Sequence, residues 1–146
     1  MIKKSEIEFK MRLRDGYPGP TRFADFIVDG QSLYDSYAKH YDFVSCLGWG
    51  SEDFQQKHIS RLILLSQSDF PNGKNSIYIC PACADLGCGA VYSFIEMNKD
   101  IVSWTFIDDR EQLMNNSKTF HFDKKDYIKQ INSTYGLGGF KFPWGK

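Results

Sequence analysis

The chain has 146 residues, and its 18 basic and 18 acidic side chains give a formal net charge of zero. A hydrophobic fraction of 42% at this length predicts one folded domain with its own core, and excludes a disordered chain. The balanced charge argues against a nucleic-acid-binding protein, which usually carries a basic excess.

The N-terminal lysines, Lys3 and Lys4, are not followed by an apolar run, so we expect no signal peptide. No stretch approaches the roughly 20 apolar residues that cross a membrane. We therefore expect a cytoplasmic protein without membrane contact, whose cysteines stay reduced.

Apolar and charged side chains alternate over residues 6–14, which predicts a strand with one wet face. The Gly- and Pro-rich residues 16–20 predict a turn, and residues 23–28 predict a second strand. An N-terminal hairpin is the expected result. Residues 31–40 then predict a short helix.

A longer helix is expected to begin after Ser51, a good N-cap, and to run to about Leu65. His58 lies on the apolar stripe of this helix. That position favours a packed histidine over a metal ligand.

The second half of the chain predicts a three-stranded meander over residues 76–79, 91–97 and 101–107. A last helix is expected after Asp123, and residues 135–146 form either a packed or a mobile arm. The predicted fold is therefore α+β: an antiparallel sheet, made of the hairpin and the meander, packed with about three helices in one domain over residues 1–146.

A short segment between two of the predicted strands holds three of the four cysteines: Cys80, Cys83 and Cys88. The spacing of Cys80 and Cys83 suits two thiolates that bind one zinc ion, and Cys88 offers a third ligand. A zinc knuckle would place the fourth ligand at Ser93, which cannot serve. Cys46 or a histidine from elsewhere in the fold would have to complete the site.

Two other interpretations of this segment need no metal. Cys80-Pro81-Ala82-Cys83 resembles the redox motif of glutaredoxins, in which the first cysteine heads a helix. Gly87 and Gly89 instead indicate a turn, where cysteines fill small buried spaces. The compact turn is favoured because it accounts for the segment without any chemistry.

The centre of the chain resembles a family of small bacterial proteins over residues 77–90, which read IYICPACADLGCGA. Residues 47–50 and 120–127 match the same family in the right order, so the resemblance spans about residues 23–133. Some members resemble immunity proteins of contact-dependent growth inhibition toxin systems. The resemblance implies a shared fold and a toxin-binding role, and it brings no catalytic residues.

We therefore expect a non-enzymatic immunity protein that binds a cognate toxin domain by direct contact and needs no cofactor. A small zinc-binding protein and a thiol oxidoreductase are the alternatives. Inhibitors of nucleases often present carboxylates to their targets. Such a patch is expected at five acidic residues: Asp108, Asp109, Glu111, Glu96 and Asp100.

Overall fold

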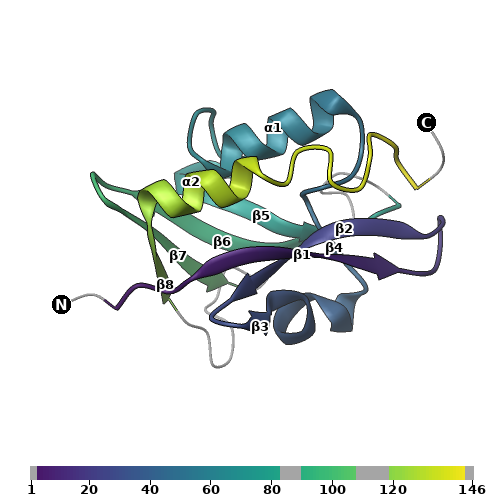
Figure 1. The fold of residues 1–146 in the computed structure, drawn as a ribbon, viewed down its shortest axis with the longest axis horizontal. Helices are drawn as coiled ribbons and strands as arrows, with labels where there is room; N and C mark the ends of the chain where they lie inside the picture. The colour runs from purple at the N-terminus through teal and green to yellow at the C-terminus, as the bar shows by residue number, and fades with distance from the viewer. Residues whose placement is uncertain (1–2, 83–89, 108–118, 144–146) are drawn as a thin grey trace.

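The computed structural model describes residues 3–82, 90–107 and 119–143. Two antiparallel sheets form the body of the protein (Figure 1). The first sheet has the order β1-β2-β3 and the second the order β4-β5-β6-β7-β8. Their strands are β1 (Ile7–Arg14), β2 (Thr21–Val28), β3 (Gln31–Ser32), β4 (Val44–Ser45), β5 (Lys74–Ile79), β6 (Ala90–Met97), β7 (Ile101–Ile107) and β8 (Thr119–Asp123).

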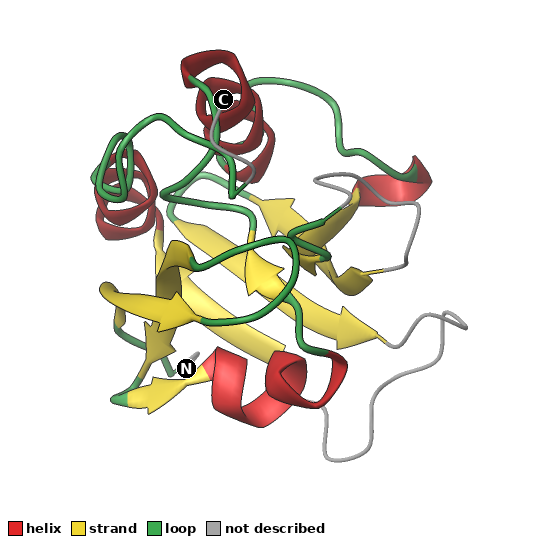
Figure 2. Ribbon diagram, turned by 90° about the vertical axis from the view of Figure 1, so that its right-hand side faces the viewer, coloured by secondary structure: helices red, strands yellow, loops and turns green. Residues whose placement is uncertain are grey.

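Two α-helices, α1 (Glu52–Leu62) and α2 (Lys124–Asn132), lie on the same side of the sheets (Figure 1). A helical segment over residues 34–41 lies on the other side, so the sheets form the middle of the molecule (Figure 2). The predicted α+β class is confirmed. No helix of the described residues is long and apolar enough to cross a membrane.

The predicted N-terminal hairpin is confirmed, with Ile7 opposite Val28. The predicted helix over residues 31–40 begins later than expected, at Tyr34. Asp29 and Gly30 both have positive φ, the conformation of a tight hairpin turn, so the chain first folds back as β3.

The predicted meander is confirmed as β5, β6 and β7, and it is flanked by two strands that were not predicted, β4 and β8. In β8, Phe122 pairs with Val102, and Phe120 pairs with Trp104. The alternation in β8 covers only five residues, which is too short to distinguish a strand from the approach to a helix.

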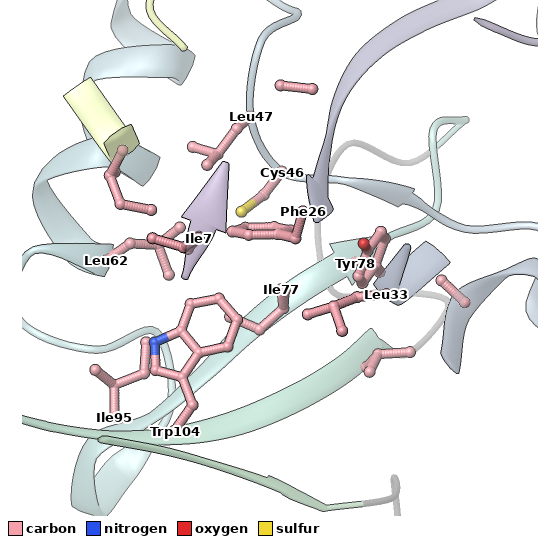
Figure 3. Close-up of a cluster of buried hydrophobic side chains, with 14 of the residues drawn as sticks. Ile7, Phe26, Leu33, Cys46, Leu47, Leu62, Ile77, Tyr78, Ile95 and Trp104 are labelled. Atoms are coloured by element: carbon pink, nitrogen blue, oxygen red, sulfur yellow. The ribbon is translucent and has the colours of Figure 1, made fainter. Parts of the chain in front are cut away.

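Buried aliphatic and aromatic side chains fill the space between the sheets and the helices (Figure 3). Trp104 is fully buried, and its indole N–H donates to the Tyr127 hydroxyl over 3.2 Å. Tyr127 in turn donates to the carbonyl of Leu62 over 2.6 Å. This chain of hydrogen bonds fixes α2 and the end of α1 to β7, and hence to each other.

The C-terminal arm packs against the body as far as residue 143. The buried Gln55 side chain donates to the carbonyl of Gly139 over 2.7 Å and accepts from the N–H of Gly136 over 2.7 Å. The N–H of Gly138 donates to the carbonyl of Gly48 over 2.9 Å. Backbone-to-backbone contact at Gly138 leaves no room for a side chain.

Replacing Gly138 with alanine is expected to loosen the arm. A β-carbon there would overlap the carbonyl oxygen of Gly48, which is backbone and cannot move aside cheaply. We expect a loss of about 1–3 kcal/mol in the free energy of unfolding. Hydrogen exchange should also speed up in the arm, and unchanged exchange over residues 136–143 would contradict this packing.

Candidate functional site

The predicted zinc ligands do not all come together in the described residues. Pairing of Ser45 with Tyr78 places Cys46 about three residues along the sheet from Cys80, which corresponds to about 10 Å. Cys83 and Cys88 lie outside the described residues. Within the described ranges, no group of three or more His, Cys, Asp or Glu side chains is placed to hold a metal ion. The zinc site stays a prediction.

Cys46 belongs instead to a buried polar cluster around Arg61, which we call the Arg61 cluster: Cys46, His58, Arg61, Asp69, Asn75 and Ser76. The Cys46 sulfur accepts from Arg61 Nη2 over 3.5 Å. Complete burial raises the pKa of this thiol to about 11. Cys46 is therefore protonated at neutral pH, which does not suit a nucleophile.

Arg61 is the centre of the cluster although its side chain is only 2% exposed. One terminal nitrogen donates to Asn75 Oδ1 over 2.9 Å and to the carbonyl of Ser76 over 3.0 Å. The same nitrogen lies 3.6 Å from the Asp69 carboxylate. The guanidinium thus joins α1 to β5 and to the loop before it, as a structural element.

His58 takes part as a neutral ring. Arg61 Nη2 lies 2.6 Å from His58 Nδ1, and a guanidinium can only donate, so Nδ1 accepts. Burial, followed by the positive charge of Arg61, lowers the pKa of His58 well below its usual range. The expectation of a packed histidine is confirmed.

The free energy of unfolding should fall as the pH drops below about 6.5. A histidine in the unfolded chain has a pKa of about 6.5, whereas the pKa of folded His58 lies well below it. The unfolded state therefore binds a proton that the folded state does not, with a slope approaching about 1.4 kcal/mol per pH unit. Urea unfolding at several pH values should show this slope in the wild type and a smaller one in His58→Gln. Equal slopes in the wild type and in His58→Gln would contradict a neutral His58 ring in the folded protein.

The acidic residues expected at a toxin contact are only partly described, since Asp108, Asp109 and Glu111 lie outside the described residues. Glu96 is exposed on β6, and Asp100 lies in the turn before β7. Asp100 lines a surface hollow together with four lysines, and Glu96 is not among its lining residues. The acidic toxin contact therefore stays a prediction.

A different surface has the features of a binding site. A groove of about 330 Å³ lies between α1 and the residues that follow α2. We call it the helical groove, and it is lined by Gln56, Ile59, Ser60, Ile63, Leu65, Asn132 and Tyr135. Three aliphatic side chains, Ile59, Ile63 and Leu65, give the groove an apolar surface, and the amide and hydroxyl groups add hydrogen-bonding capacity. This composition suits a protein surface better than a charged small molecule.

Large apolar side chains at this groove are exposed to solvent. Leu65 is 77% exposed and Tyr135 is 39% exposed, and both line the groove. The Tyr135 ring contacts the ring of Phe140, with 5.1 Å between centroids. Leu137, in the same turn of chain, is also exposed. Exposed apolar side chains gathered at a hollow mark an interaction surface.

The backbone at the end of α1 places Leu65 at the groove. Leu64 adopts a left-handed conformation with φ of 62°, which is uncommon for a residue with a side chain. The N–H of Leu65 then donates to the carbonyl of Ser60 over 2.8 Å and closes the helix. A glycine would take this conformation more easily, so the cost of Leu64 is consistent with a functional site.

Sequence reasoning missed the helical groove because it extended the helix and its apolar stripe to about Leu65. The helix ends at Leu62, and Leu65 points to solvent. One sequence signal could have indicated the groove. Leu65 is an apolar residue at the very end of the stripe, directly before the polar residues 66–69.

Comparisons of the chain with protein-family models, with curated proteins and with solved structures find no match.

Proposed function

We propose that this protein is an immunity protein that binds a cognate bacterial toxin domain by direct contact and so neutralises it. The observation that carries the proposal is the helical groove with its exposed apolar side chains. A protein of this kind needs a stable surface matched to one partner, and no catalytic group. The toxin as the partner follows from the family resemblance of residues 77–90.

The rigidity of the groove supports this proposal. Both of its helical walls are fixed through the hydrogen bonds that link Trp104, Tyr127 and Leu62. The wall after α2 is also held by Gln55, which accepts from the N–H of Gly136. A preformed surface loses less conformational entropy on binding and therefore binds more tightly.

Tyr135 has the properties of an interface anchor. Its ring is supported by Phe140, and its hydroxyl lies 3.4 Å from Gln56 Nε2 and 3.5 Å from a carboxylate oxygen of Glu52. Tyrosine is enriched among the residues that contribute most to binding energy, because it combines a large apolar ring with a polar end.

Growth of bacteria that express the toxin tests the proposal. The adjacent upstream gene should encode a toxin domain, which arrests growth when it is expressed alone. Co-expression of this chain is expected to restore growth, and the double variant Leu65→Asp/Tyr135→Ala is expected to restore it poorly. A neighbouring gene without a toxin, or a toxin that this chain leaves active, would contradict the proposal.

A further inference from the structure

Four lysines surround a hollow of about 480 Å³ at the beginning of α2. We call it the lysine hollow, and it is lined by Lys4, Lys99, Asp100, Asp123, Lys124, Lys125 and Ile128. These residues come from the N-terminal segment, from the turn between β6 and β7, from the end of β8 and from α2. The fold therefore gathers lysines that are far apart in the sequence.

The charge of the lysine hollow is positive. Four lysines against two aspartates leave an excess of two positive charges. One of the two carboxylates, that of Asp123, is already engaged, because it accepts from the N–H of Asp126 over 3.2 Å and lies 3.5 Å from Lys4 Nζ. Within the described residues, Lys99, Lys124 and Lys125 have no carboxylate within ion-pair distance.

Two of these lysines occupy positions that helix stability disfavours. Lys124 and Lys125 are the first two residues of α2, where the helix dipole favours acidic side chains. A choice of residue that costs local stability is expected where a site serves binding. The stability of α2 therefore does not explain the two lysines.

The lysine hollow and the helical groove lie at opposite ends of one face of α2. Lys124, Ile128 and Asn132 follow each other at intervals of four residues, which places them on the same side of the helix. Lys124 and Ile128 line the hollow, and Asn132 lines the groove. At 1.5 Å per residue, the two ends are about 12 Å apart, so one bound protein can span both.

We propose that the lysine hollow binds a carboxylate-rich segment of the protein that occupies the helical groove. The inference rests on the proposed function for the identity of that protein. Opposite charge at the edge of an apolar contact raises the association rate and fixes the orientation of the partner. The partner therefore carries Asp or Glu side chains next to the apolar surface that enters the groove.

A nucleic acid is the competing polyanion, and the charges favour a carboxylate segment over it. The net charge of the whole chain is zero, and the local excess of two positive charges matches a short acidic segment better than a long phosphate backbone. A protein that tracks nucleic acid usually has a basic excess.

A peptide of consecutive glutamates tests the inference without the toxin. In NMR titrations, this peptide should shift the amide signals of Lys99, Lys125 and Ile128, whereas a glutamine peptide of equal length should not. The variant Lys124→Gln/Lys125→Gln should bind the glutamate peptide roughly fivefold more weakly. Lys10→Gln/Lys39→Gln, with the same change in charge at exposed sites elsewhere, should bind it like the wild type.

The inference is overturned if the glutamate peptide shifts none of these signals, or if both double variants bind it equally. Tighter binding of a single-stranded oligothymidylate to the same residues would overturn it in favour of nucleic acid. Because the titration contains no toxin, its failure leaves the growth experiment unaffected, and failure of growth rescue leaves the titration interpretable.

Discussion

Replacing Arg61 with leucine is expected to lower the free energy of unfolding by about 3–5 kcal/mol, because a buried charged network would lose one partner. Asp69 would keep the hydrogen bonds from Ser76 but lose the only cation near it in the Arg61 cluster. Asn75 and the carbonyl of Ser76 would each lose a buried donor. Urea unfolding followed by tryptophan fluorescence measures the change.

Arg22→Leu is the matched control for this experiment. Arg22 is exposed on β2, so the same substitution there should change the free energy of unfolding by no more than about 0.5 kcal/mol. If the two variants had equal stability, the Arg61 cluster would contribute nothing to folding. A selective loss in Arg61→Leu would confirm that the cluster stabilises the end of α1, and with it one wall of the helical groove.

Replacing Leu65 with aspartate is expected to weaken toxin binding by at least about 30-fold, the effect of losing one major contact residue at an interface. The new carboxylate would have to be desolvated against an apolar surface. Because Leu65 is 77% exposed, the folded protein should keep its stability. Calorimetric titration with the toxin domain of the adjacent gene measures the affinity.

Leu13→Asp makes the same change at a leucine that is 54% exposed at the end of β1, away from the groove. Its affinity for the toxin domain should match that of the wild type. Equal losses in the two variants would mean that binding does not depend on the helical groove.

The regular elements could be predicted from the sequence because their patterns are long. Eight residues in β1 alternate between apolar and charged side chains, and β6 and β7 are runs of seven or eight mostly apolar and aromatic residues. The N-caps of both helices could also be predicted from the sequence. The side chains of Ser51 and Asp123 accept hydrogen bonds from backbone N–H groups, as expected of N-caps. Strands β4 and β8 are too short to produce a pattern, and β4 has only two residues.

The binding surfaces could not be predicted because tertiary packing creates them. The helical groove joins Leu65 to Tyr135, which are far apart in the sequence. Asp100 suggested an acidic contact, and only the fold shows that Lys4 and Lys124 lie in the same hollow. The role of Cys46 likewise depends on Arg61, and no spacing rule connects them.

The central claim is that the helical groove binds the toxin, and hydrogen exchange on the purified complex tests it most directly. The chain is mixed with the toxin domain of the adjacent gene, and amide exchange is compared with that of the free chain. We expect slower exchange at the end of α1, over residues 59–66, and over residues 132–140. A stable complex that protects only the N-terminal hairpin, or the absence of any complex, would contradict the account.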